Sequence, residues 1–287
     1  MFDFSRNSKC WCGSGLKYKK CHINVEASID IYLKNGYKMP DLSLIKTKED
    51  IEGIRKSALI TKTILDMLTE KALVGVSTNE LNEFVHNYTL SCGGVPAPLN
   101  YDGFPSSICT SINEVICHGI PSDRILKDGD IVNIDITTIL GGYYSDASRM
   151  YMIGNVSEEA KRLVECTKEA LEIGLRSVVP YRPFHDIGNA IGPYAKEKGY
   201  SIVRDFGGHG VGNDFHEEPF IYHFASDEKD ILMLPGMVFT IEPMLNVGMS
   251  ACKILDDEWA AVTKDGSLSA QWEHTVLVTE DSFEVLV

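Results

Sequence analysis

The spacing of hydrophobic residues predicts four amphipathic helices. Apolar side chains recur three or four positions apart, as one helix face requires, over residues 48–73, 80–91, 157–175 and 186–198. Ser77 or Thr78 and Ser157 stand where helix N-caps are expected, and glycine or proline separates the helices of each pair. Strand-like stretches follow each pair, so the order helix, helix, strands occurs twice. This order predicts an α+β fold built from two similar halves, with a site between them.

Residues 130–150 predict a β-hairpin that carries two acids. The stretch is rich in β-branched residues and is interrupted by Gly141-Gly142, a pair that suits a two-residue turn. If the strands pair directly across this turn, Thr137 faces Asp146 and Asp135 is the diagonal neighbour of Asp146, about 7–8 Å away. Two acids on one apolar face repel each other unless cations compensate. The hairpin is therefore a candidate metal site.

Composition and charge narrow the class of protein. The chain has 287 residues and a net charge of −14, with 44% hydrophobic and 24% charged residues, as a globular enzyme of one large or two modest domains has. Such acidity argues against sequence-specific nucleic-acid binding. No apolar run reaches the ~20 residues of a membrane span, and the N-terminus lacks the pattern of a secretory signal. Eight cysteines, mostly scattered in apolar contexts, favour reduced thiols and a cytoplasmic location.

The first part of the chain holds a closely spaced set of possible zinc ligands. Cys10, Cys12, Cys21 and His22 fall within thirteen positions, around a Gly13-Ser14-Gly15 turn. Four soft or borderline ligands are the number that a closed structural zinc site uses, and so short a segment needs the metal in order to fold. The alternative is a disordered tail with incidental thiols.

This segment resembles the SEC-C motif, a zinc knuckle that also occurs at the end of the SecA translocase, with the same four residues in the ligand positions. Its lysines make a basic patch, which is either a solvated face or a contact with a ribosome or chaperone. Residues 26–40 lack a clear period and predict a linker. We therefore expect three parts: the knuckle (residues 1–25), the linker (26–40) and the body (41–287).

Five further residues in the body carry possible chemistry. His118 ends an apolar stretch, His209 lies among glycines, and His216 follows shortly after; Glu242 and Glu273 stand on strand-like stretches. Taken singly, each is more often a solvent-facing or hydrogen-bonded structural residue. Together with Asp135 and Asp146, the two glutamates and His209 match the ligands that a pair of divalent ions prefers.

Other catalytic motifs are excluded by their spacing. His216-Glu217 lacks the second histidine of a zincin helix, because Phe220 occupies that position and Pro219 interrupts the helix. The glycines around His209 do not match a dinucleotide-binding loop, and the chain has no nucleophile elbow and no Walker loop.

Six stretches of the body resemble the type I methionine aminopeptidases of the pita-bread fold. The stretches are NYDGFPSSICTSINEVICHGIP, VNIDIT, YYSDASRM, GGHGVGNDFHEEP, FTIEPM and QWEHTVLVT. The resemblance implies two α/β halves related by a pseudo-twofold axis. It also implies metal-dependent removal of N-terminal methionine from nascent polypeptides with a small second residue, by attack of metal-activated hydroxide on the first peptide bond.

The resemblance also implies a role for each matched residue. Two divalent ions, Co²⁺, Mn²⁺, Fe²⁺ or Zn²⁺, are expected on Asp135, Asp146, His209, Glu242 and Glu273, with Thr137 supporting the ligands. Glu242 would also accept a proton from the attacking water. His118 would contact the scissile amide, and His216 would stabilise the developing oxyanion. The methionine side chain would lie among Tyr101, Phe104, Cys109, Phe215 and Trp259.

One residue departs from the family pattern, and two other functions stay open. Pro98 stands where bacterial members often carry cysteine, which alters the rim of the pocket. An X-Pro aminopeptidase or prolidase of the same fold would carry a longer N-terminal domain and other pocket motifs. A non-catalytic binding protein of this fold would have lost at least one ligand.

Overall fold

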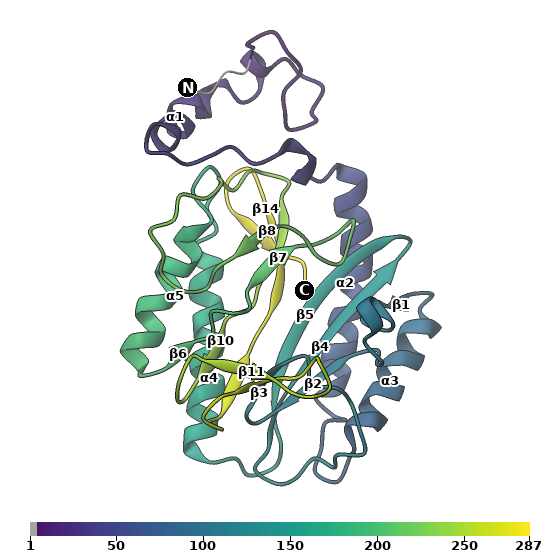
Figure 1. Ribbon diagram of the computed structural model, residues 1–287. Coiled ribbons are helices and arrows are strands. Elements are labelled where there is room, and N and C mark those ends of the chain that lie inside the picture. Colours follow the sequence, from purple (N-terminus) through teal and green to yellow (C-terminus); the bar gives the residue numbers. More distant parts are fainter. Residues whose placement is uncertain (1–4) are drawn as a thin grey trace.

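The computed structural model describes residues 5–287, and its main helices lie where the hydrophobic spacing predicts them (Figure 1). Helix α2 is longest, and Thr47 caps it in a reciprocal hydrogen-bonded box with Asp50. Ser77 and Glu80 form the same box at α3. The four helices of the body are α2 (Lys48–Leu68), α3 (Thr78–Ser91), α4 (Glu158–Arg176) and α5 (His185–Lys198). No helix in the described part of the chain is long and apolar enough to cross a membrane.

The predicted hairpin is present with the predicted register. Strands β4 (Ile131–Leu140) and β5 (Tyr143–Met152) join through Gly141 and Gly142, both with positive φ. Thr137 pairs with Asp146, and Asp135 pairs with Ser148, so Asp135 is the diagonal neighbour of Asp146. Both acids therefore lie on one face of the hairpin.

The hairpin belongs to the sheet of the first half, and a five-stranded sheet forms most of the second. In the first sheet β4 pairs with β5 along its whole length and with β2 and β1 over successive parts, while α2 packs on β4 and β5. In the second half β14 lies between β9 and β15, and β7 lies between β9 and β8. The strands of these two sheets are β1 (Val95–Pro96), β2 (Cys109–Ile112), β7 (Gly208–Gly210), β8 (Glu217–Ile221), β9 (Val238–Ile241), β14 (His274–Val278) and β15 (Phe283–Val285).

Two small sheets complete the second half. One has the order β13-β10-β6 and packs against α4; the other, β11-β12-β3, lies at the lower edge in Figure 1. Their strands are β3 (Val115–Cys117), β6 (Ser201–Ile202), β10 (Met244–Asn246), β11 (Cys252–Ile254), β12 (Ala261–Thr263) and β13 (Ser269–Gln271).

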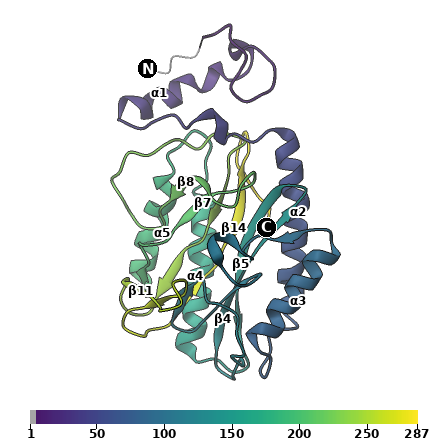
Figure 2. The same ribbon diagram turned by 45° about the vertical axis from the view of Figure 1, so that its right-hand side comes forward.

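The two halves meet along β5 and β14. Helices α2 and α3 lie outside one half and α4 and α5 outside the other, with the strands between them (Figures 1 and 2). The backbone N–H of Glu273 donates to the carbonyl of Ser148, and the Thr275 hydroxyl donates to the carbonyl of Asp146. The order helix, helix, strands thus occurs twice, and the seam between the halves contains two of the predicted metal ligands.

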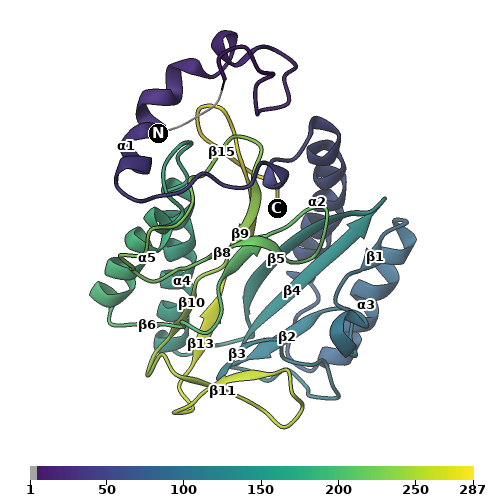
Figure 3. The same cartoon turned by 45° about the horizontal axis from the view of Figure 1, so that its top comes forward.

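The segment that we predicted as a linker contains a helix. Residues Glu26–Lys34 form α1, in which Ile29 is fully buried in the same hydrophobic cluster as the core of the second half. Val25, Tyr32 and Leu33 pack partly buried against the same cluster, so the apolar spacing is helical. It covers only the nine residues of a short helix, and we did not predict it. Residues 36–46 then run across the second half (Figure 3), where Lys38 bridges to Ile231 and Ile45 to Met237. The division into knuckle, linker and body remains a prediction, and its residues 1–4 lie outside the described part of the chain.

Candidate active site

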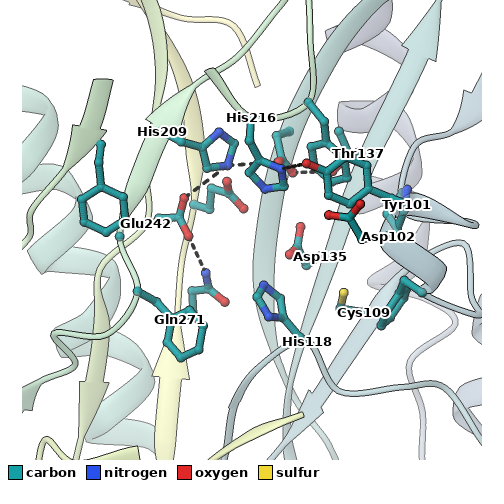
Figure 4. A pocket seen from close by; sticks show the side chains of 18 of the residues that line it. Tyr101, Asp102, Cys109, His118, Asp135, Thr137, His209, His216, Glu242 and Gln271 are labelled. Carbon is teal, nitrogen blue, oxygen red and sulfur yellow. Dashed lines mark hydrogen bonds and ion pairs between the residues drawn. The ribbon is translucent and has the colours of Figure 1, made fainter. Parts of the chain in front are cut away.

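A cavity of about 650 Å³ opens between the two halves, and every chemistry-bearing residue predicted in the body lines it. Figure 4 shows these side chains converging from strands of both halves. The predicted residues in its lining are Tyr101, Phe104, Cys109, His118, Asp135, Thr137, Asp146, His209, Phe215, His216, Glu242, Trp259 and Glu273, with Pro98 at the same cavity.

The hairpin contributes two acids and the threonine that orients one of them. The Thr137 hydroxyl donates to Asp146 Oδ1 at 2.8 Å. Asp135 Oδ1 is shielded from solvent and has no hydrogen-bond partner among the described residues. A buried carboxylate oxygen without a partner is costly unless a cation or a proton satisfies it. Asp135 therefore fits a metal ligand.

The second half brings a histidine and two glutamates to the same point. Ligand atoms of Asp146, His209 and Glu273 lie within 4.8 Å of one another. His209 Nε2 lies 3.7 Å from Asp146 Oδ2 and 3.8 Å from Glu242 Oε1, while its Nδ1 faces the carbonyl of Gly210 at 2.9 Å. The hydrogen bond to Gly210 places the proton on Nδ1 and leaves the Nε2 lone pair free for an ion.

Three residues that we did not predict hold Glu242 in place. The Thr240 hydroxyl donates to Glu242 Oε1 at 2.7 Å, and the Gln271 amide donates to Oε2 at 3.2 Å. The Glu242 backbone N–H donates to the buried His223 at 3.1 Å. Thr240 and Gln271 each stand two positions before a predicted ligand, and this spacing places them on the same strand face. That spacing is the signal that could have found them.

The pKa values of the site reflect buried, mutually repelling acids. Burial raises the pKa of Glu242 to about 8 and that of Asp135 to about 6. Burial and the neighbouring carboxylates raise the pKa values of Asp146 and Glu273 well above their ordinary range. Burial lowers the pKa of His209 to about 4. An acid-rich pocket with a neutral histidine is the donor set that hard or borderline cations prefer.

The glycines around His209 allow neighbouring strands, rather than a ligand, to approach. A side chain at Gly208 would collide with the carbonyl oxygen of Thr240 on β9, and one at Gly210 with the carbonyl oxygen of Glu218 on β8. The backbone N–H of His209 donates to the Thr240 hydroxyl at 3.0 Å. The glycines at this segment are therefore explained by the packing of β7 between its neighbours.

His118 and His216 lie on opposite sides of the proposed ligands. His118, just after β3, has a positive φ of 57° and a pKa that burial lowers to about 4. His216 precedes β8, and its Nδ1 lies 2.9 Å from the Tyr101 hydroxyl. Both side chains point into the cavity (Figure 4), where neutral imidazoles can donate or accept hydrogen bonds.

A buried ion pair holds the loop that carries His216, and we did not predict it. Lys46 Nζ contacts Glu217 Oε2, and the Lys46 side chain is only 2% exposed. Glu217 Oε1 accepts the backbone N–H groups of Asn213 and Asp214 at 2.7 and 2.9 Å. Glu217 therefore fixes both ends of the loop that presents His216.

Aromatic side chains form an apolar slot beside the acids. Tyr101 and Phe215 meet edge to face with ring centres 4.7 Å apart, and Phe104 and Trp259 do so at 5.1 Å. Cys109 lies on β2 directly opposite Asp135, which places the slot beside the proposed ligands. A flexible thioether suits such a slot because sulfur–aromatic contacts add about 0.3–1.5 kcal/mol.

The four predicted zinc ligands also converge, in the N-terminal segment that lies above the body in Figure 1. Ligand atoms of Cys10, Cys12, Cys21 and His22 lie within 4.8 Å of one another. His22 Nδ1 is 3.2 Å from both Cys10 Sγ and Cys21 Sγ, and Cys12 Sγ is 3.5 Å from Cys21 Sγ. A tetrahedral zinc ion with ordinary bond lengths would separate its ligands by roughly 3.6–3.8 Å, so the cluster fits this ion closely.

Comparison with known proteins defines the family. The model of metallopeptidase family M24 matches residues 52–280, and that of the SEC-C motif matches residues 6–24. The chain belongs to metallopeptidase family M24. Its fold is the pita-bread fold of that family, as the six sequence stretches predicted.

Within the family, methionine aminopeptidases are similar to the chain over nearly its whole length. The methionine aminopeptidase of Chlamydia trachomatis is 47% identical over 286 residues, which cover 98% of each chain. The crystal structure of methionine aminopeptidase from Rickettsia prowazekii superposes with a TM-score of 0.83 and 46% identity, covering 84% of this chain and 98% of that one. X-Pro aminopeptidase from Thermotoga maritima has a TM-score of 0.68 at 21% identity and shares the fold alone; this chain spans 62% of its length.

Proposed function

We propose that this chain removes the N-terminal methionine from nascent polypeptides whose second residue is small, and that it acts in the cytoplasm. Relatives that match nearly the whole chain at almost half identity support methionyl aminopeptidase activity. The observation that carries the proposal is one cavity in which a cluster of acids and a neutral histidine lies beside an aromatic slot.

The proposed metal centre takes two divalent ions on five ligands from both halves. Asp135 would hold one ion, His209 would help to hold the other, and Asp146 and Glu273 would bridge them, with Glu242 beside the second. Bound ions would lower the pKa of a water molecule and so supply the nucleophile near neutral pH. The donor set accepts Co²⁺, Mn²⁺, Fe²⁺ or Zn²⁺, whereas the thiol-rich knuckle takes one structural Zn²⁺.

The remaining side chains would position the substrate and move its protons. Glu242, held by Thr240 and Gln271, is oriented to accept a proton from the nucleophile. His216 would donate to the carbonyl oxygen as charge develops there, and His118 would contact the scissile amide. The slot formed by Tyr101, Phe104, Cys109, Phe215 and Trp259 would hold the methionine side chain, with Pro98 at its rim.

Peptide hydrolysis tests this function against the alternative of an X-Pro enzyme. The metal-free protein is incubated with Met-Ala-Ser, Met-Leu-Ser and Ala-Pro-Ala, with and without Mn²⁺ or Co²⁺. We expect metal-dependent release of methionine, fastest from Met-Ala-Ser. Release of alanine from Ala-Pro-Ala alone would instead favour the X-Pro enzyme, and no hydrolysis of any peptide would favour a binding protein.

The basic knuckle would bring the enzyme to its substrates at the ribosome or at a chaperone. Exposed lysines at positions 9, 17, 19 and 20 give this segment a charge opposite to that of the acidic body. Co-sedimentation with ribosomes is compared for the full chain and for a chain that lacks residues 1–25. Equal co-sedimentation would contradict a ribosomal role for the knuckle.

A further inference from the structure

His22, the histidine of the knuckle, presents its two ring nitrogens to different groups. His22 Nδ1 lies among the cysteine sulfurs, 3.2 Å from Cys10 Sγ and from Cys21 Sγ. The other ring nitrogen, Nε2, lies 2.8 Å from Glu280 Oε2. Glu280 belongs to the body, in the turn between β14 and β15, and is 258 positions away in the chain. A carboxylate of the body therefore reaches the back of a knuckle ligand.

The two ends of this contact differ sharply in exposure. The His22 side chain is 8% exposed, whereas that of Glu280 is 63% exposed. Trp11 covers the histidine at a ring distance of 4.4 Å and also meets Tyr181 of the body at 6.3 Å. Cys10, Trp11, Tyr18 and Ile29 belong to the same hydrophobic cluster as the core of the second half. The knuckle is thus packed on the body around the Glu280 contact.

The chemistry of the histidine makes this contact more than a surface ion pair. An exposed pair between a charged histidine and a glutamate contributes little, because water screens it. When Nδ1 binds an ion, however, the ring is neutral and its proton must be on Nε2, which then donates to Glu280. Such a carboxylate–histidine–metal arrangement fixes the tautomer and ring orientation and raises the basicity of the ligand.

We propose that Glu280 of the body completes the metal site of the knuckle from outside, so that zinc binding and docking of the knuckle are coupled. Glu280 is a positioning residue: it accepts the Nε2–H of His22 and aims Nδ1 at the ion. Because the two events share His22, docking strengthens zinc binding and zinc strengthens docking by the same factor. The inference rests on the proposed knuckle zinc and is independent of the peptidase chemistry.

Cobalt distinguishes the knuckle from the active site, because only a thiolate-bound Co²⁺ gives an intense sulfur-to-metal absorption band. The full-length chain is titrated with Co²⁺ and then with competing Zn²⁺, while the band is followed. Glu280→Ala should weaken binding at the knuckle about 10- to 100-fold, the usual effect of losing such a partner. Asp281→Ala is the matched control: it removes an exposed acid from the same turn and should leave binding unchanged.

A second readout tests the coupling to docking. Hydrogen exchange of residues 5–25 is measured in the full-length chain with and without Zn²⁺. We expect Zn²⁺ to protect this segment in the parent chain and in Asp281→Ala, and to protect it less in Glu280→Ala at the same zinc concentration. Glu280→Gln keeps an acceptor for Nε2–H and should restore part of both effects.

Two results would overturn the proposal, and they are distinguishable. Knuckle affinity and protection that are equal in Glu280→Ala and in the parent chain would show that Glu280 makes only a surface contact. If the parent chain gave no thiolate–cobalt band, the knuckle would bind no metal and the proposal would fail at its premise. Neither result bears on methionine release, which is measured separately.

Discussion

At the scale of single residues, three of the five proposed ligands have a polar residue two positions away that supports a ligand. Thr137 follows Asp135, Thr240 precedes Glu242, and Gln271 precedes Glu273. Alternation places both members on one strand face, so the sequence indicates that they share a surface. The register of the hairpin also predicts that Thr137 faces Asp146, and the Thr137 hydroxyl donates to that acid. The contact of Gln271 with Glu242 was not predicted, because it depends on the pairing of strands that are remote in the sequence.

Asp146→Asn should sharply reduce metal binding at the active site. The amide loses the charge that would bridge two ions, so we expect a loss of more than about 100-fold in affinity, beyond the roughly 10–100-fold typical of an orienting partner. Thr137→Val removes only the hydrogen bond to Asp146, so its loss of metal affinity should stay within the roughly 10–100-fold range. Equilibrium dialysis with Mn²⁺ measures both. Equal losses in the two variants would argue against a bridging role for Asp146.

At the scale of elements, the features that repeat in the sequence are the ones that could be predicted. The four body helices and the hairpin have long periodic patterns, and the structure confirms them. Helix α1 has only nine residues, so its apolar pattern is too short to stand out. The loop before β8 is held by the contact of Lys46 with Glu217, and no local sequence pattern predicts a contact between segments so far apart in the chain.

Removing the buried charge of Lys46 should disturb the loop that carries His216. Lys46→Met leaves Glu217, whose side chain is 15% exposed, without its cation. Breaking a fully buried pair in this way costs about 3–5 kcal/mol, so we expect a loss at or below the lower end of that range. We expect lower stability toward urea and a lower kcat with unchanged metal content. The double variant Lys46→Met/Glu217→Gln removes both charges and should recover part of the stability. If the loss of stability in the double variant equalled the sum of the losses in Lys46→Met and in Glu217→Gln, the two residues would not be coupled.

A side chain at Gly208 should displace β7 and with it His209. In Gly208→Ala the added methyl group meets the carbonyl of Thr240, so we expect a loss of about 1–3 kcal/mol, the usual range for overpacking. Gly141→Asn is the matched control, because the turn leaves open space there and Asn-Gly suits its conformation. Urea unfolding of metal-free protein measures both. An equal loss in both variants would show that crowding at β7 is not the cause.

At the scale of the whole molecule, the acids of the cavity oppose folding as long as no cation is bound. Glu242 has a pKa near 8 in the folded protein against an ordinary 4.5, and Asp135 one near 6 against 3.8. At a pH between the ordinary pKa and the folded-state pKa of each acid, the folded protein keeps a proton on that acid that the unfolded chain has lost. Below about pH 7 the histidines with lowered pKa values, such as His209, act in the opposite direction, because they are protonated only in the unfolded state. Above about pH 7 they are neutral in both states, so the stability of the metal-free protein should fall as pH rises further.

Thermal unfolding between about pH 7 and about pH 8 checks this dependence, because the ordinary pKa of histidine lies below this window and the pKa of Glu242 lies at its upper end. We expect the melting temperature of the metal-free protein to fall over this range. Mn²⁺ should raise the melting temperature most at the highest pH, where the ligands are ionised. Free Mn²⁺ at a thousand times its Kd stabilises the folded protein by about 4 kcal/mol. A flat or rising melting temperature without metal would contradict the raised pKa values.

The proposed ligands are shared between the halves: Asp135 and Asp146 come from the first, and His209, Glu242 and Glu273 from the second. An ion therefore binds only while the halves are closed on each other, and it penalises every state in which they have separated. Such open states are the ones that cellular proteases attack. The lifetime of this enzyme in a cell should follow its metal supply, so that metal starvation reduces the amount of the protein as well as its activity.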